Sequence, residues 1–377
     1  MTASALQSAG TTTTRVGIVG CGVIAKVYAE KLNALPFIDL VACADLEQQR
    51  ADTFAQTHGI SRALSVAELV ADPGIDLIVN LTIPQAHVSV SRAAIDAGKS
   101  VYSEKPLALT VAEGRELVAA AHAAGLRIGC APDTFLGAGL QTCRGLIDSG
   151  AIGEPVAANA FMLSPGPESW HPRPQIFYER GAGPMFDMGP YYFTALVMLL
   201  GPARRITGSA RITHAQRTIG SEPLKGQQIK VEVPTHVTSV IDFVSGPVAT
   251  LVTSFDVQAS RYRFLEIYGT EGTLAVPDPN TFGGGVQIKR HPRDEWHDVP
   301  LTHGNAQQSR GIGLADMVRA VQRKRPHRAS GELALHVLDL MESSIRASEL
   351  GAHVNLGTTC ARPEPLAAGL PDDTLED

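Results

Sequence analysis

The chain has 377 residues, of which 44% are hydrophobic, and its formal net charge is −6. A single hydrophobic core rarely grows beyond roughly 250–300 residues, so this length predicts two domains. The acidic balance and the lack of a long basic run argue against nucleic acid or a membrane surface as a partner.

The two ends of the chain and its cysteines indicate a cellular compartment but suggest no catalytic residue. Residues 1–13 are rich in Ser, Thr and Ala and lack the basic and apolar regions of a signal peptide. We expect them to form a disordered N-terminal tail, and residues 361–377, with their prolines and acidic end, to form a mobile C-terminal tail. Five cysteines without C-x-x-C spacing predict reduced thiols in a cytoplasmic protein.

The first part of the chain alternates short apolar runs with helix-length amphipathic segments. This pattern predicts a doubly wound parallel sheet covered by helices on both faces, over residues 14–132. Capping boxes at residues 65–68 and 110–113 mark two helix starts, and Gly98 and Gly125 fall where left-handed caps end helices. The strands are expected at residues 15–19, 40–44, 77–81, 100–102 and 127–129.

A glycine-rich turn follows the first of these strands and opens a helix over residues 23–35. Gly20 permits the tight turn, and Gly22 lets the backbone approach a pyrophosphate at the helix N-terminus. Together with Val23 and Ile24, these residues predict a dinucleotide site. The alternative is an ordinary connection between a strand and a helix.

Asp45 closes the second strand about twenty residues further on, where a carboxylate accepts hydrogen bonds from ribose hydroxyls and repels a 2′-phosphate. This position favours NAD as the cofactor. Arg50 follows closely and would pair with a 2′-phosphate, so NADP is the alternative. Asp45 could also be a solvated loop acid.

Glu104, Lys105 and Pro106 come directly after a later strand of the predicted sheet. A lysine at the carboxyl end of a parallel strand projects into the crevice where a dinucleotide binds. Lys105 is therefore a candidate catalytic residue. The alternative is a lysine that merely caps the end of a strand.

The stretch from Asn80 to Pro106 resembles the Gfo/Idh/MocA family, which includes glucose-fructose oxidoreductase and inositol dehydrogenase. The resemblance implies an N-terminal Rossmann domain and a C-terminal open, mostly antiparallel sheet with flanking helices. It also implies a homodimer or homotetramer, because one face of that sheet often forms an oligomer contact. The matching residues are Thr82, Pro84, His87, Ala97, Gly98, Lys99, Glu104, Lys105 and Pro106, then Gly181, Ala182, Gly183 and Asp187, and residues 268–274.

The second part of the chain, residues 133–360, agrees with this from its own pattern, because strand-like runs with segregated helices indicate an α+β domain. We expect it to bind the substrate and to form the oligomer contact. Strands are predicted at residues 156–163, 206–212, 236–243, 249–254, 264–268 and 286–289, and helices at residues 140–149, 191–200, 314–322 and 333–349.

The resemblance also implies the chemistry of the site, which is oxidation of a sugar or cyclitol alcohol by hydride transfer. Thr82, Pro84, His87 and Glu104 would belong to the cofactor site, with Glu104 orienting Lys105. Lys105 would steady the developing alkoxide, and partial desolvation near the nicotinamide would lower its pKa so that it could also pass a proton.

Asp187 matches the substrate-binding aspartate of the family, but Tyr191 stands where the family has a histidine taken as the general base. A tyrosine has a reference pKa near 10 and acts as a base only if positive charge lowers it. Lys105 could supply that charge. The alternatives are that Tyr191 positions the substrate or packs in the core, and that nearby His171 is the base or an ordinary loop histidine.

Four further residues are candidates for substrate binding. Trp170 and Tyr178 could stack on the apolar face of a sugar ring. Asp133 and Thr134 follow the last strand of the first domain, at the edge where ligands bind in such sheets.

The leading hypothesis is thus an NAD(P)-dependent dehydrogenase acting on a secondary alcohol of a sugar, sugar derivative or cyclitol. One rival is an NAD-dependent glycoside-cleaving enzyme that works through a transient oxo-sugar and releases no net NADH. The other is a nicotinamide-binding regulatory sensor, which the missing histidine keeps open. The scattered histidines predict no metal site.

Overall fold

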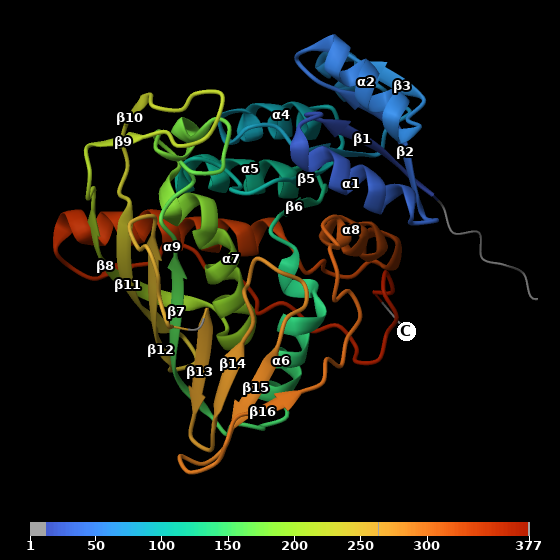
Figure 1. The fold of residues 1–377 in the computed structure, drawn as a ribbon. Helices are drawn as coiled ribbons and strands as arrows, with labels where there is room; N and C mark the ends of the chain where they lie inside the picture. Colours follow the sequence, from blue (N-terminus) through green and yellow to red (C-terminus); the bar gives the residue numbers. More distant parts are fainter. Residues whose placement is uncertain (1–12, 263, 376–377) are drawn as a thin grey trace, which may run out of the picture.

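The computed structural model describes residues 13–262 and 264–375, which form two sheets with covering helices (Figure 1). The expected N-terminal tail lies outside the described residues except for its last position. The first sheet is parallel, with strand order β3-β2-β1-β4-β5-β6, which confirms the predicted doubly wound domain. Its elements are β1 (Thr14–Val19), α1 (Val23–Asn33), β2 (Ile38–Ala44), α2 (Gln48–His58), β3 (Arg62–Leu64), α3 (Val66–Ala71), β4 (Leu77–Asn80), α4 (Pro84–Asp96), β5 (Ser100–Ser103), α5 (Val111–Ala123) and β6 (Ile128–Cys130).

Local signals in the sequence set several helix boundaries of this domain. Ser65 and Thr110 cap α3 and α5, since each side chain accepts from a backbone N–H and a glutamate three residues on bonds back. Gly98 and Gly125 follow α4 and α5 with φ angles of 75° and 68°, a conformation that glycine adopts without strain. All four predictions are confirmed.

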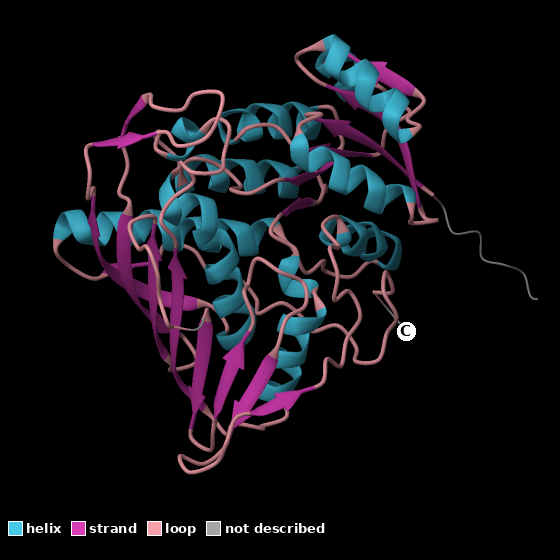
Figure 2. Ribbon diagram, in the orientation of Figure 1, coloured by secondary structure: helices cyan, strands magenta, loops and turns pink. Residues whose placement is uncertain are grey.

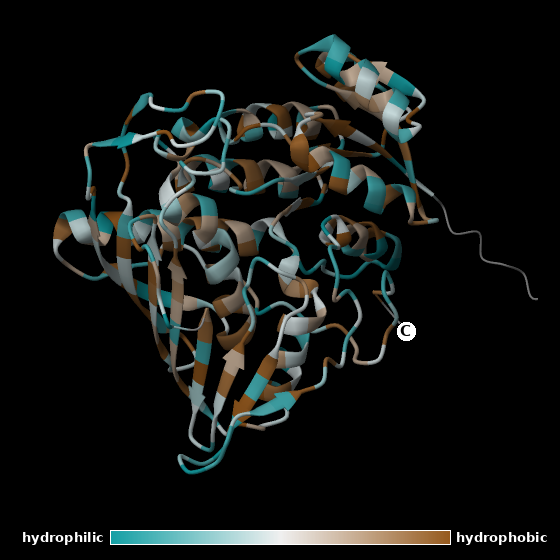
Figure 3. Cartoon of the chain, viewed as in Figure 1, coloured by the Kyte–Doolittle hydropathy of each residue, from teal (hydrophilic) through white to brown (hydrophobic). Residues whose placement is uncertain are grey.

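The second sheet has the strand order β16-β15-β14-β13-β7-β12-β11-β8-β17 and is antiparallel except between β7 and β12. Buried and partly exposed residues alternate along β15 and the first part of β13, and Figure 3 shows the matching alternation of hydrophobic and hydrophilic residues. Helices α6, α7 and α9 pack on one face (Figure 2), which confirms the predicted α+β architecture. None of the described helices is long and apolar enough to span a bilayer.

The elements of this second part include a small separate hairpin, β9 with β10, that the sequence did not predict. The strands are β7 (Pro155–Leu163), β8 (Ala203–Arg211), β9 (Gln216–Thr218), β10 (Gln228–Lys230), β11 (His236–Phe243), β12 (Val248–Ser254), β13 (Leu265–Gly269), β14 (Thr273–Val276), β15 (Val286–Lys289), β16 (His297–Val299) and β17 (Val354–Asn355). The helices are η1 (Thr134–Leu136), α6 (Ala138–Asp148), η2 (Pro174–Phe177), α7 (Gly183–Leu200), α8 (Ile312–Arg323) and α9 (Gly331–Leu350).

Helix α7 begins at Gly183 and not at Tyr191 as expected, so Asp187 lies inside the helix. Glycines and Pro190 lower the helix propensity of this stretch, but its residues from Gly189 onward are all buried, and that packing outweighs propensity. Pro190 has no N–H to donate, so the helical hydrogen-bond ladder is interrupted next to Asp187.

The last part of the chain is packed, and the expectation of a mobile tail over residues 361–377 is wrong as far as Leu375. Arg362 donates to two carbonyl oxygens near the end of α7 at 2.9 and 2.6 Å. Asp373 pairs with Lys31 of α1, and Leu375 is only 4% exposed. The segment therefore crosses both parts of the molecule, through partners that its proline-rich composition does not reveal.

Candidate active site

The glycine-rich turn joins β1 to α1 at the carboxyl edge of the parallel sheet. Gly20 has a φ angle of 99°, and a Cβ there would lie 2.6 Å from the carbonyl oxygen of Leu81, so this close packing requires glycine. A Cβ on Gly22 would meet no protein atom within 4 Å. The backbone at Gly22 therefore faces open space at the N-terminus of α1, where a pyrophosphate would fit.

Asp45 follows β2, and its side chain bonds to the backbone of this turn. Its carboxylate accepts from the backbone N–H groups of Cys21 at 2.9 Å and Glu47 at 3.0 Å. Arg50 contacts the carboxylates of Asp45 at 3.4 Å and Glu47 at 2.7 Å. Because the Arg50 guanidinium is already shared between two carboxylates, it is less available to a 2′-phosphate, and these contacts suit NAD.

Three large apolar side chains are exposed along the same edge, one at the start of α1 and two shortly after β2 and β4. Val23 is 96% exposed, Leu46 97% and Ile83 65%. Single exposed apolar residues are common, but three around a phosphate-binding turn suit the flat faces of adenine and nicotinamide. Sequence reasoning missed Leu46 and Ile83, although their positions directly after strands were a usable signal.

His87 is fully buried and supports the cofactor edge from behind. Its Nδ1 lies 2.6 Å from the carbonyl oxygen of Pro106, and its Nε2 lies 3.0 Å from that of Thr82. Burial lowers the pKa of the ring, while the two carbonyl groups act in the opposite direction. His87 therefore ties the loop at Thr82, which Pro84 leads into α4, to the segment that carries Lys105.

Lys105 lies just beyond β5, and its ammonium contacts α7. Nζ donates to the carbonyl oxygen of Asp187 at 2.7 Å and to its Oδ1 at 2.9 Å. Glu104 accepts from the backbone N–H of Lys105 at 3.0 Å and from the hydroxyl of Tyr28 at 2.9 Å. Burial acts to lower the pKa of Lys105, but the negative groups around it, Asp187 first, outweigh burial and raise it. The expected lowering is wrong, and Lys105 is charged at neutral pH.

Tyr191 lies one helical turn after Asp187, on the same side of α7. The ammonium of Lys105 sits 5.4 Å from the centre of the Tyr191 ring. The side chain is 8% exposed, and burial raises the pKa of its hydroxyl although Lys105 and Arg310 oppose the shift. The lysine thus acts in the expected direction, but desolvation is the larger effect.

These groups open into one cavity of about 650 Å³. Ile24, Glu104 and Lys105 from the parallel-sheet part face Asp187 and Tyr191 of α7 across it. The cofactor edge and the candidate chemical groups therefore border the same space. The remaining lining residues are Met162, Ser164, Pro165, Gly166, Pro167, Ser169, Trp170, Phe177, Met188, Phe255, Asn280 and Arg310.

Arg310 and Asn280 were not predicted to belong to the site. Arg310 donates to the Asn280 side-chain oxygen at 2.7 Å and to that of Gln308 at 3.0 Å. Burial acts to lower the pKa of Arg310, but Tyr191 and more distant carboxylates raise it. Arg310 is thus a second cation beside Tyr191. Both residues lie in loops far along the chain from any motif, so no local signal could have found them.

The aromatic residues that we expected near the substrate lie in different places in the structure, and only some of them line the cavity. Trp170 lines the cavity and is 66% exposed. His171 does not line it, and its ring packs edge-on against Trp170 and Phe177 with centroids 5.4 and 4.9 Å away. Tyr178 is fully buried against Phe255, so the expectation that it stacks on a sugar ring is wrong.

Asp133 and Thr134 are each 1% exposed and lie outside the cavity lining. Asp133 Oδ2 accepts from the backbone N–H groups of Gly311 at 2.8 Å and Gly313 at 3.0 Å. It therefore binds the start of α8 in place of the expected substrate hydroxyls. Burial raises the pKa of Asp133 to about 6, although the two N–H groups oppose the shift.

Family models match both parts of the chain. Residues 14–131 match a family model described as the oxidoreductase family with an NAD-binding Rossmann fold, and residues 140–275 match the GFO/IDH/MocA C-terminal domain. The chain is 31% identical to 1,5-anhydro-D-fructose reductase of Ensifer adhaerens, over 91% of this chain and 99% of that protein. It is 27% identical to trans-1,2-dihydrobenzene-1,2-diol dehydrogenase of Oryctolagus cuniculus, over 88% and 95%.

The fold comparison gives the same architecture. The structure of levoglucosan dehydrogenase in complex with NADH superposes with a TM-score of 0.79 and covers 92% of this chain and 100% of that one. At 19% identity this likeness speaks for the fold alone.

The buried carboxyl of Asp133 generates a prediction about stability. A carboxyl with a raised pKa favours its protonated form in the folded state, so its contribution to the free energy of unfolding falls as pH rises through about 4 to about 6, by up to about 3 kcal/mol. An Asp133→Asn variant keeps an acceptor for both N–H groups but cannot titrate. Urea unfolding at several pH values should show wild type losing stability relative to the variant over this range. Parallel pH profiles would contradict the assignment.

Proposed function

Because this chain belongs to the Gfo/Idh/MocA oxidoreductase family and carries an NAD-binding Rossmann domain, we propose that it transfers a hydride between nicotinamide and a secondary alcohol. The substrate class that we propose is a sugar, a sugar derivative or a cyclitol. Relatives named as an anhydrofructose reductase and an inositol 2-dehydrogenase support this class.

The observation that carries the proposal is the shared cavity. Ile24, in the first turn of α1 directly after the glycine-rich turn, lines the same space as Lys105 and Asp187. A cofactor bound along the sheet edge would therefore present its nicotinamide to a substrate held against α7. At about 650 Å³ the space is of the size that small-molecule sites occupy.

Lys105 and Asp187 would handle the substrate oxygen. Bound NAD would accept the hydride from the carbinol carbon. The Lys105 ammonium, charged at neutral pH, would donate a hydrogen bond to the reacting oxygen and stabilise the negative charge that develops there. Asp187 orients that ammonium through the 2.9 Å contact, and its carboxylate would also accept from a neighbouring substrate hydroxyl.

Tyr191 is the group that we propose to exchange the hydroxyl proton. Its hydroxyl is buried in the cavity wall, and Lys105 and Arg310 both favour its ionised form. His171 lies outside the cavity lining, so Tyr191 is favoured over His171 as the base. Since burial raises the pKa of Tyr191, it holds its proton at neutral pH, which suits carbonyl reduction. Oxidation of the alcohol requires the phenolate.

A homodimer or homotetramer is part of the proposal. Helices pack on one face of the nine-stranded sheet, and the other face carries half-exposed apolar and hydroxyl side chains such as Phe161, Thr238, Val240 and Val248. The same face also carries the Arg205–Asp242 ion pair and Glu266, and a mixed face of apolar, hydroxyl and charged side chains suits contact with a second copy.

We also propose a cytoplasmic location with NAD as the preferred cofactor. The five cysteines are all free thiols, which suits a reducing compartment. The pairing of Arg50 with Asp45 and Glu47 supports NAD over NADP.

Substitution of Lys105 tests the reaction class. NADH formation should be measured with a panel of sugars, cyclitols and glycosides, for wild type, Lys105→Met and His171→Ala. Lys105→Met should lower kcat/KM at least about a hundredfold because it removes the charge that stabilises the alkoxide. His171→Ala should retain most activity. Glycoside cleavage without NADH would instead support the glycoside-cleaving alternative, and NADH binding without any turnover would support a sensor.

The pH profile tests the role of Tyr191. Oxidation needs the deprotonated hydroxyl, whose pKa is raised, so kcat/KM for oxidation should climb with pH throughout the alkaline range, while reduction should vary little near neutrality. Tyr191→Phe should abolish the climb and slow both directions. A neighbouring substitution, Tyr192→Phe, is the control because the Tyr192 hydroxyl points to the carbonyl oxygen of Phe161. An unchanged alkaline climb in Tyr191→Phe would assign the proton to another group.

A further inference from the structure

One wall of the cavity is a single segment, residues 164–178, that contains only the short helix η2. We call it the wall segment. A second cavity of about 400 Å³ lies against its other side and shares Pro165, Gly166 and Ser169 with the first. Between Pro165 and Ser169 the wall segment borders a cavity on each side, so specific contacts hold this part in place. Its residues that line the larger cavity are Ser164, Pro165, Gly166, Pro167, Ser169, Trp170 and Phe177.

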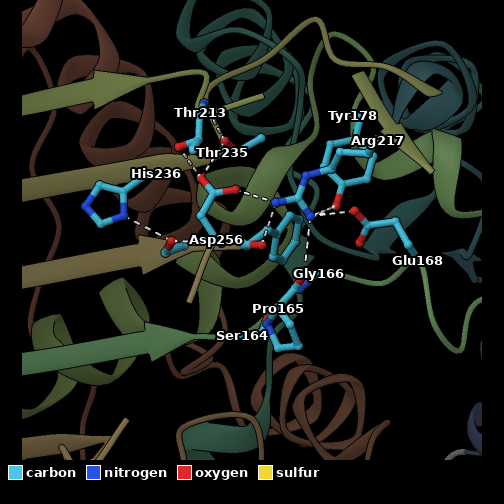
Figure 4. A network of polar contacts seen from close by, with 12 residues as sticks. Ser164, Pro165, Gly166, Glu168, Tyr178, Thr213, Arg217, Thr235, His236 and Asp256 are labelled. Carbon is cyan, nitrogen blue, oxygen red and sulfur yellow. Dashed lines mark hydrogen bonds and ion pairs between the residues drawn. The ribbon is translucent and has the colours of Figure 1, made fainter. Parts of the chain in front are cut away.

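Gly220, Ser221 and Glu232 donate backbone hydrogen bonds to the carbonyl oxygens of Glu168 and Tyr178 in the wall segment. Arg217, from β9, adds side-chain contacts to it (Figure 4). Its side chain is only 9% exposed. Nη1 donates to the carbonyl oxygen of Pro165 at 3.2 Å and to the hydroxyl of Tyr178 at 3.1 Å, and it pairs with the carboxylate of Glu168. This nitrogen, whose two hydrogens are shared among three acceptors, thus contacts both the first residues of the segment and its last.

The other terminal nitrogen of Arg217 faces the large sheet. Nη2 donates to the carbonyl oxygen of Phe255 at 2.8 Å and pairs with the carboxylate of Asp256. Asp256 is itself fixed, because it accepts from the hydroxyls of Thr213 at 2.6 Å and Thr235 at 2.7 Å (Figure 4). Arg217 therefore joins the wall segment to strands that do not belong to it.

The residue types around Arg217 fit this task closely. A guanidinium is planar and always charged, so it can bridge two carboxylates in a way that a lysine cannot reproduce. Gly166 has a φ angle of 98°, and a Cβ there would lie 2.6 Å from Arg217 Nη1 and 2.7 Å from the Tyr178 hydroxyl. The segment thus bends at glycine to admit the guanidinium. We expected Tyr178 to stack on a sugar. It packs against Arg217 instead, and Cζ of Arg217 lies 5.3 Å from the centre of the Tyr178 ring.

We propose that Arg217 is a positioning residue that fixes the wall segment and thereby sets how tightly the substrate, and not the nicotinamide cofactor, is bound. The link to substrate rests on the proposed function, because it requires the larger cavity to be the substrate site. The anchoring itself does not. The cofactor edge at Gly20, Gly22 and Asp45 lies on the other sheet and makes none of these contacts.

Two variants weaken the contacts of Arg217 while keeping a side chain of similar size in the buried space. Glu168→Gln weakens only the ion pair between Arg217 and the wall segment. Arg217→Lys keeps the positive charge but cannot pair with Glu168 and Asp256 at the same time. Arg205→Met is the matched control, since it removes an arginine–aspartate pair between β8 and β11 that does not touch the wall segment. For each protein, hydrogen exchange by mass spectrometry, NADH affinity, kcat and KM are measured.

In both anchor variants, amides in residues 164–178 should exchange about tenfold faster or more, with other regions and the control unchanged. KM for the substrate identified by NADH formation should rise at least about fivefold while kcat and NADH affinity change less than about twofold. Unchanged exchange in the wall segment overturns the proposal, as does uniformly faster exchange throughout the protein. Faster local exchange with an unchanged KM overturns the link to substrate.

Failure of the proposed function gives a different result. If wild type binds NADH but turns over no substrate, the dehydrogenase reading fails. The exchange measurement then still decides whether Arg217 anchors the wall segment.

Discussion

The contact between Lys105 and Asp187 is the interaction on which the site depends. Lys105 comes from the edge of the parallel sheet and Asp187 from α7, and the ammonium bonds to both the carbonyl and the carboxylate of the aspartate. Pro190 removes the helical donor for the carbonyl of Phe186, the residue before Asp187, so the helical ladder is interrupted next to this contact. This one group therefore links the two parts of the chain at the point where cofactor edge and cavity meet, and other features are arranged around it. His87 holds the loop next to it, and Glu104 accepts from its backbone.

The charges and the burial of the groups in the cavity explain why Lys105 and Tyr191 are both protonated at neutral pH. The ammonium of Lys105 contacts Asp187, and its interactions with the acidic groups Asp187, Tyr191 and Glu104, in that order, outweigh burial and raise its pKa. Tyr191 has the opposite surroundings, two cations and little solvent, and burial still raises its pKa. Both groups consequently hold protons at neutral pH. A site in this state is prepared to donate hydrogen bonds to a carbonyl or alkoxide oxygen.

The sequence predicted the parts of the molecule whose signals are local. Alternating apolar runs, two capping boxes and the glycine turn specify the parallel sheet, because each depends on residues close together in the chain. The start of α7 was missed since Pro190 and nearby glycines oppose a helix that only tertiary packing stabilises. Arg310 and Arg217 could not be found, because each is an isolated arginine whose role depends on segments far away in sequence. Tyr178 and Asp133 were predicted near the substrate by position, but burial gives them structural partners.

Hydride transfer at this site is tested most directly with NADH that carries deuterium at both nicotinamide C4 positions, offered with a panel of keto sugars and inososes, followed by mass spectrometry of the products. Wild type should place one deuterium on the carbinol carbon of a product, and Lys105→Met, which still binds NADH, should do so at least about a hundredfold more slowly. Products without deuterium, or no product from a protein that binds NADH, would contradict hydride transfer at this site.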